Sequence, residues 1–176
     1  QGWTPLAVAA ASGNARLIRL LLARGSLPRQ RYGASGRTPL MAAAQGGHLA
    51  AVELLLGAGA GEVALLGSNA AAGGPAAAPA VRQILASDVD DFGVSALMLG
   101  CKGGHVPVVE RLLTHGADAN SVDNAGHGPR GFAGRLGSLE ITRALLRAGA
   151  DLTARARALP IAAKCGHAAV VRALGE

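Results

Sequence analysis

Short blocks of apolar residues follow one another along the chain in pairs, and a glycine divides the two blocks of each pair. The first block is rich in alanine, as in Leu6–Ala11, and the second is rich in leucine, as in Leu17–Leu22. In the second blocks the apolar positions recur at steps of three and four residues, which is the spacing of one helical face. Alanine also favours helix and lets neighbouring helices approach closely. The pattern therefore predicts pairs of short helices joined by glycine turns.

The pairs repeat at a nearly constant distance. The segment Gly2–Leu6 has a counterpart 34 residues later in Gly36–Leu40, and both end in Thr-Pro-Leu. A period of this size is typical of a stack of small units, and one longer spacing indicates an insertion of about 24 residues. The five units start at Thr4, Thr38, Ser95, Gly128 and Arg157, with spacings of 34, 57, 33 and 29 residues.

Polar residues and glycines mark where the helices begin and end. Hydroxyl groups suit the capping position, so Thr4, Thr38 and Ser95 are expected to cap the first helices of their units. Gly128 is a tolerable cap, but Arg157 offers none, so the first helix of the fifth unit is expected to be the weakest. The expected helix-ending glycines are Gly13, Gly47, Gly104, Gly137 and Gly166 for the first helices, and Gly25, Gly57, Gly116 and Gly149 for the second.

These five registers resemble the ankyrin repeat family, whose unit is a turn followed by two helices. The resemblance covers nearly the whole chain and implies an all-α, ankyrin-repeat solenoid of stacked helix-turn-helix units with hairpin tips. It predicts a single domain over residues 1–176. The expected repeats cover about 2–35, 36–63, 90–122, 123–153 and a truncated 154–176, with an insertion loop over about 64–88.

The insertion is rich in glycine, proline and alanine. Such a tract buries too little apolar surface to fold alone, so we expect a mobile loop, in which Ala80–Leu85 could form one or two helical turns. Two interpretations stay open. The segment is either a tolerated insertion at a turn, since closing a longer loop costs little more, or a region with a partner-specific role.

The histidines and cysteines could in principle bind a metal or react, but their positions are explained by the repeat. His48, His105 and His167 recur directly after a helix-ending glycine, and the resemblance implies that they are structural and bond neighbouring turns. Stacked units place them on the order of 10 Å apart, too far for shared metal ligation. Cys101 stands at a small-residue position, so it is expected to be a packed free thiol, whereas Cys165 is expected to be partly exposed.

Several function classes find no support in the residues. The glycine run Gly57–Gly61 lacks the spacing of a dinucleotide-binding loop, and no catalytic motif is present. We therefore expect no enzyme, no cofactor, no metal and no small-molecule substrate. No run is long and apolar enough for a membrane span. Two cysteines do not make a disulfide framework, which favours an intracellular location, cytoplasmic or nuclear.

The net charge and the residues that differ between repeats are the remaining indications of function. The formal net charge is +6, and the resemblance implies that partners contact the turn tips and the exposed face of the first helices. Lys102, Arg135 and Lys164 occupy one equivalent position in three successive units, so stacking is expected to align them as a basic stripe. The candidate partner-binding residues are Trp3, Arg29, Arg31, Tyr32, Arg37, Gln45, Lys102, Arg135 and Lys164.

The expected function is that of a protein–protein interaction scaffold, which binds a partner protein or peptide, acidic in character, in the concave groove and on the turn tips. The alternative is that these are ordinary solvated charges. A nucleic-acid-binding module would fit the high pI, but the chain lacks the stacking aromatics and dense Lys/Arg runs of such proteins. A substrate-recruiting domain of a larger enzyme or channel is the third possibility.

Overall fold

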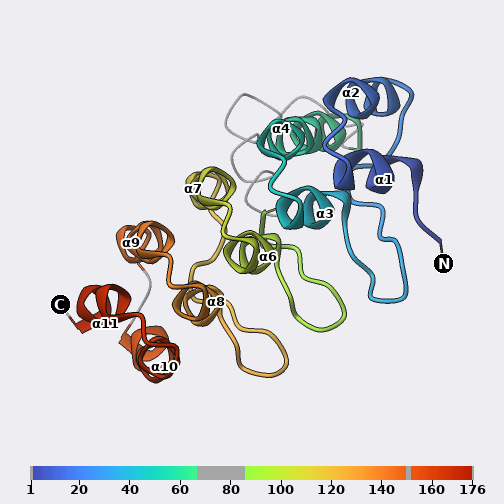
Figure 1. Ribbon diagram of the computed structural model, residues 1–176. Helices are drawn as coiled ribbons and strands as arrows, with labels where there is room; N and C mark the ends of the chain where they lie inside the picture. Colours follow the sequence, from blue (N-terminus) through green and yellow to red (C-terminus); the bar gives the residue numbers. More distant parts are fainter. Residues whose placement is uncertain (1, 67–85, 150–151, 176) are drawn as a thin grey trace.

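The computed structural model describes residues 2–66, 86–149 and 152–175, and these residues form two rows of helices with hairpins projecting from one row (Figure 1). The inner row, from which the hairpins project, holds α1 (Pro5–Ala11), α3 (Pro39–Gln45), α6 (Ala96–Gly103), α8 (Pro129–Leu136) and α10 (Leu152–Lys164). The outer row holds α2 (Ala15–Ala23), α4 (Leu49–Leu66), α7 (Val106–Thr114), α9 (Leu139–Arg147) and α11 (Ala168–Gly175). The expected all-α solenoid of stacked helix-turn-helix units is confirmed.

The predicted hydroxyl caps are present at the start of the inner helices. The side-chain oxygen of Thr4 accepts from the amide of Ala7 at 3.2 Å. In the same way Thr38 accepts from the amide of Met41 at 3.4 Å, and Ser95 from that of Met98 at 3.3 Å. Each bond satisfies an amide that has no partner inside its helix, so three of the five inner helices start where a Thr or Ser stands. Gly128 begins α8 without a side-chain cap.

One of the predicted helix ends is wrong. Gly57 does not end its helix, because α4 continues through it to Leu66. The other eight glycines do take the left-handed conformation that ends a helix, with φ between +67° and +85°. After Gly57 the sequence supplies alanine, glutamate and leucine and no proline before residue 67, and these good helix formers outweigh the cost of isolated glycines. Residues 64–66, which were expected to begin the insertion loop, are therefore helical, and the rest of that expected loop up to residue 85 lies outside the described residues.

The expected start of the fifth unit is also wrong. Helix α10 begins at Leu152, so Arg157 lies inside a helix and is not its first residue. Pro160 lies inside the same helix. A run of alanines and arginines precedes Arg157, and these residues have high helix propensity, so the helix extends toward the N-terminus past the aligned start. The predicted turns at Ala80–Leu85 lie outside the described residues.

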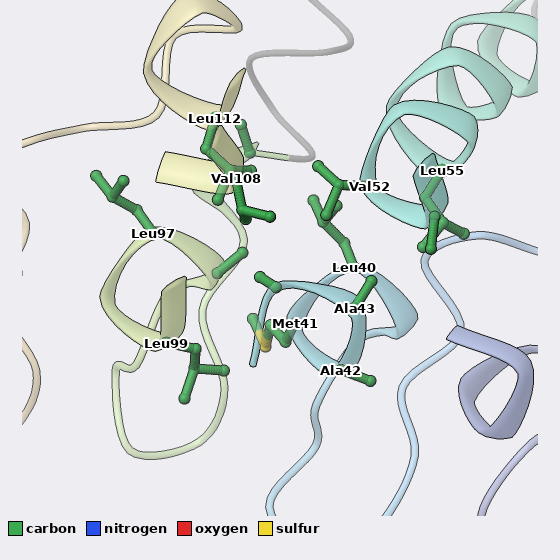
Figure 2. Packing of buried hydrophobic residues seen from close by; sticks show 14 of the residues in the cluster. Leu40, Met41, Ala42, Ala43, Val52, Leu55, Leu97, Leu99, Val108 and Leu112 are labelled. Carbon is green, nitrogen blue, oxygen red and sulfur yellow. The ribbon is translucent and has the colours of Figure 1, made fainter. Parts of the chain in front are cut away.

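The core runs between the two rows. Val52 of α4 faces Leu40 of α3, and Val108 and Leu112 of α7 lie over α6 (Figure 2). Met41 is fully buried and points from α3 toward α6, so it links two successive units (Figure 2). Buried residues from α1 to α9 form one continuous cluster. Within the described residues the fifth unit has a small cluster of its own, made of Ala158, Ala162, Val170 and Leu174.

The hairpins are joined to one another through their main chains. The amide of Asp91 donates to the carbonyl of Ser35 at 3.0 Å, which links the hairpins of units two and three. The amide of Asn124 donates to the carbonyl of Phe92 at 2.9 Å, which links units three and four. These bonds join the hairpins of units two, three and four into one continuous edge.

Candidate partner-binding groove

Four of the nine candidate residues line one open hollow of about 600 Å³ at the N-terminal end of the inner row. Trp3 precedes α1, Tyr32 and Arg37 close the base of the second hairpin, and Gln45 ends α3. A hollow of this size accepts a side chain together with a short stretch of main chain. The complete lining is Trp3, Ala11, Tyr32, Gly33, Ala34, Ser35, Arg37, Ala42, Gln45 and Gly46.

Two aromatic rings form the apolar part of the hollow. The ring centroids of Trp3 and Tyr32 are 4.6 Å apart, and their planes are inclined by 39°. Tyr32 is buried at 4% exposure, whereas Trp3 is 59% exposed. Tyr32 therefore supports an indole ring that remains open to a ligand. Burial raises the pKa of the Tyr32 phenol, and the positive charge of Arg37 offsets part of that rise, so the phenol is neutral at physiological pH.

Arg37 supplies the polar part of the hollow. Its Nη1 donates to Oε1 of Gln45 at 2.9 Å, and its Nε donates to Oδ2 of Asp90 at 3.4 Å. The Asp90 side chain is fully buried and also accepts from the amides of Phe92 and Val94. The guanidinium is thus fixed at the wall between two partners, while its Nη2 makes no hydrogen bond within the described part of the chain.

The predicted basic stripe lies along the C-terminal ends of the inner helices. Lys102, Arg135 and Lys164 each lie in the last turn of their helix, on α6, α8 and α10, and all three are exposed. None of the three side chains makes a hydrogen bond or an ion pair in the described ranges. Because α6 packs on α8 and α8 on α10, the three cations follow one another along the stack. Gln45 holds the equivalent position on α3.

The inner helices carry no carboxylate. The sequences of α1, α3, α6, α8 and α10 contain no aspartate or glutamate. The acidic residues of the described segments lie on the hairpins and the outer helices instead, as with Asp91 and Glu140. No opposite charge on the inner row therefore neutralises the basic stripe.

The three repeated histidines fix the ends of the inner helices. Nε2 of His48 lies 3.0 Å from the carbonyl oxygen of Ala11, and Nε2 of His105 lies 3.1 Å from that of Gln45. Nε2 of His167 lies 3.1 Å from the carbonyl oxygen of Arg135. Each histidine thus bonds the helix end of the preceding unit, which confirms the structural role predicted for them. Two of the accepting residues, Gln45 and Arg135, belong to the groove.

Two of the candidate arginines lie away from the hollow and are engaged within the chain. Arg29 donates to both carboxylate oxygens of Asp88, at 3.0 and 2.7 Å. Arg31 donates to the carbonyl of Val89 at 2.9 Å and to Oδ1 of Asp91 at 3.3 Å. These contacts tie the second hairpin to the segment that follows the insertion. Sequence reasoning missed this role, although the cluster of three aspartates at residues 88–91 was a usable signal.

Sequence reasoning also missed the small residues that shape the hollow. Ala11 and Ala42 form part of its lining, and Gly33–Ser35 forms its hairpin side. A glycine-bounded turn of this kind is recognisable in the sequence between Tyr32 and Arg37, but its approach to α1 and α3 depends on the tertiary packing. Phe92, at 60% exposure on the third hairpin, is a second exposed aromatic outside this hollow.

The described segments contain neither a metal site nor a membrane-spanning helix. No group of three or more His, Cys, Asp or Glu side chains is placed to hold a metal ion in residues 2–66, 86–149 and 152–175. Over the same residues, none of the helices combines the length and the apolar character that crossing a bilayer requires.

Comparison with known proteins places the chain in a family. The sequence profile described as ankyrin repeats (3 copies) matches residues 1–63 and 68–156. The chain is 34% identical over 93 residues to ankyrin repeat domain-containing protein 63 of Mus musculus, a match that covers 48% of this chain and 24% of that protein. It is 37% identical over 91 residues to the E3 ubiquitin-protein ligase KEG of Arabidopsis thaliana, with 51% and 5% covered.

A third relative is the transcription regulator FGM4 of Gibberella zeae, which is 32% identical over 92 residues, covering 48% of this chain and 35% of that protein. The matched part thus spans about a third or less of each of these relatives. The profile match extends over most of the sequence, and it agrees with the stacked helix pairs, the capped inner helices and the histidines that link them. The chain belongs to the ankyrin repeat family.

Proposed function

We propose that this chain is a protein-interaction scaffold that binds an acidic peptide, or an acidic segment of a protein surface, along its inner helices. Members of the family generally act as protein–protein interaction modules. The observation that carries the finer proposal is the charge of the inner row. It presents three exposed cations at equivalent positions, each without a partner in the described structure, and it contains no carboxylate.

The physical reason concerns both rate and specificity. Exposed ion pairs add little affinity one at a time, but a row of like charges attracts an oppositely charged chain over about a Debye length and rejects basic competitors. The hollow at Trp3 adds apolar area at one end of that row. Two free cysteines, one buried and one exposed, support a reducing, intracellular location for this interaction.

The test compares two variants with the same loss of charge. The groove variant is Lys102→Gln with Arg135→Gln and Lys164→Gln. The matched control removes three exposed cations of the outer row, Arg19→Gln with Arg143→Gln and Arg172→Gln. The probe is a fluorescein-labelled peptide of about 12 residues, extended and rich in glutamate. Its binding is followed by fluorescence anisotropy at several salt concentrations.

We expect the groove variant to bind at least about tenfold more weakly and with a flatter salt dependence, because three charge contacts are lost together. The control should bind nearly as well as the unmodified protein, because its cations lie on the other row. Equal losses in the two variants would reduce the effect to net charge and would contradict the proposal. A random single-stranded oligonucleotide that binds more tightly than the peptide would favour a nucleic-acid module instead.

A further inference from the structure

We propose that the groove recognises a two-part peptide: one apolar or aromatic anchor side chain seats on Trp3 in the hollow, and carboxylates spaced about three residues apart follow along the inner helices. This inference rests on the proposed function and adds to it the anchor and the spacing of the charges.

The lining of the hollow selects the anchor. Two aromatic rings and the small side chains of Ala11 and Ala42 offer apolar contact, and the indole ring of Trp3 is open to solvent. A lysine or arginine side chain could stack on the same rings, but it would meet the guanidinium of Arg37 at the wall. An uncharged apolar or aromatic side chain meets no such repulsion and buries the exposed ring.

Arg37 defines where the first carboxylate lies. Its Nε and Nη1 are held by Asp90 and Gln45, which leaves Nη2 as a donor at the edge of the hollow. The buried carboxylate of Asp90 offsets part of the positive charge. Arg37 therefore supplies a directed hydrogen bond to an acidic residue beside the anchor, while the unpaired cations farther along the stack supply the stronger field.

The spacing follows from the repeat. Successive inner helices pack about 10 Å apart, and an extended peptide advances about 3.3 Å per residue, so one repeat corresponds to about three residues. The residues at equivalent places on four successive inner helices are Gln45, which is bonded to Arg37, and then Lys102, Arg135 and Lys164. Carboxylates at every third residue would each meet one of these places, whereas adjacent carboxylates would compete for the same cation.

The test uses three synthetic peptides with equal numbers of glutamates, in a glycine and serine background, and without tryptophan. The first has a leucine anchor and glutamates at every third residue. The second has the same anchor and adjacent glutamates, and the third has spaced glutamates but glycine in place of the anchor. The first and second are made with the anchor at either end of the chain, because the groove does not fix the chain direction.

Trp3 is the single tryptophan of the protein, so its fluorescence reports directly on the hollow. We expect the anchored, spaced peptide to bind at least about fivefold more tightly than either comparison peptide in one of its two directions, and to shift the Trp3 emission. The variant Trp3→Ala should lose this preference for the anchored peptide. Phe92→Ala is the matched control, because it removes a ring of similar exposure outside the hollow and should leave the preference unchanged.

Two failures can be told apart. If all three peptides bind equally and Trp3→Ala has no effect, while the three-cation groove variant still weakens binding, then the anchor and the spacing are refuted and the acidic groove survives. If no acidic peptide binds, or the groove variant binds as well as the outer-row control, the proposed function itself fails. Circular dichroism melting of Trp3→Ala confirms that any lost binding is not lost folding.

Discussion

Nε2 of His105 lies 3.1 Å from the main-chain carbonyl oxygen of Gln45, a residue 60 positions earlier in the sequence. A carbonyl oxygen only accepts, so the imidazole donates through Nε2. The bond joins units two and three across the inserted segment, and it fixes the end of α3, where Gln45 meets Arg37. One side chain therefore connects the register of the repeat with the geometry of the hollow.

Replacement of His105 is expected to weaken the fold by a measurable amount. His105→Ala loses the bond to Gln45 and leaves space beside Gly47, whose missing Cβ would lie 2.5 Å from the ring. We expect the free energy of unfolding to fall by about 1–2 kcal/mol in urea denaturation. His115→Ala is the control, because that ring bonds Arg111 in its own helix, and a loss as large there would contradict the inter-unit role.

In the fourth unit, the effects of two substitutions on stability are expected to be coupled. Ser138 stands where units two, three and five have histidine, and Leu136 fills the space over Gly104, with its Cδ2 2.8 Å from where a Cβ would be. Ser138→His alone should destabilise by about 1–3 kcal/mol, because the ring and Leu136 compete for one space. With Leu136→Gly added, the loss should be smaller than the sum of the two single losses, measured as a double-mutant cycle. Strict additivity would refute the competition.

The buried carboxylate of Asp90 should matter more than its exposed neighbour. Asp90 accepts from two hairpin amides and from Arg37, whereas the Asp91 side chain is 57% exposed. Asp90→Asn is expected to cost about 2 kcal/mol of unfolding free energy, and Asp91→Asn less than about 0.5 kcal/mol. Chemical denaturation of both variants at neutral pH measures the difference. Similar values for the two would contradict the role given to burial.

The buried thiol of Cys101 should make the stability of the folded protein depend on pH under alkaline conditions. Burial raises the pKa of Cys101 well above its ordinary value of 9.0, so the folded protein keeps a proton that the unfolded chain loses. Stability is therefore retained below about pH 9 and falls as the pH rises, by up to about 1.4 kcal/mol per pH unit. Cys101→Ala places an alanine where units one and two have Ala10 and Ala44. Between about pH 8 and about pH 10, the free energy of unfolding of this variant should fall by about 1.4 kcal/mol less than that of the unmodified protein. Identical pH profiles would refute this.

The fifth unit should exchange its amide hydrogens fastest among the described helices. Its core cluster is small and separate from the continuous cluster of units one to four, and α10 contains Pro160. Repeat arrays draw their stability from cores shared between units, so a unit whose buried residues form a small separate cluster is expected to open more often. Hydrogen exchange followed by mass spectrometry should show lower protection for α10 and α11 than for α6 and α7. Equal protection would contradict this separation.

Most of the architecture could be predicted because its signals are local. A threonine or serine before an apolar block, as with Thr38, caps a helix wherever it stands, and a repeated Gly-His pair implies the same bond in each unit. Alignment to the repeat predicts the wrong helix boundaries at Gly57 and Arg157, because helix propensity outweighs the repeat pattern there. In both places the neighbouring residues favour helix, and the sequence pattern contains no signal that marks the boundary of the helix.

The candidate site was only partly predictable for a different reason. Equivalence between repeats aligned Lys102, Arg135 and Lys164 without any knowledge of distances. The hollow depends on how the second hairpin folds back toward α1, and Arg29 and Arg31 depend on aspartates almost 60 residues away in sequence. Those pairings are set by the return of the chain after the insertion, which repeat periodicity does not describe.

The ionisable side chains of the inner helices are those of arginine and lysine and the thiol of Cys101, whose pKa burial raises. No carboxylate of these helices offsets the exposed cations, so this surface carries a positive potential. Under the proposed function, charge on the bound molecule would then control binding: a phosphate added to an acidic partner would strengthen attachment, and its removal would weaken it.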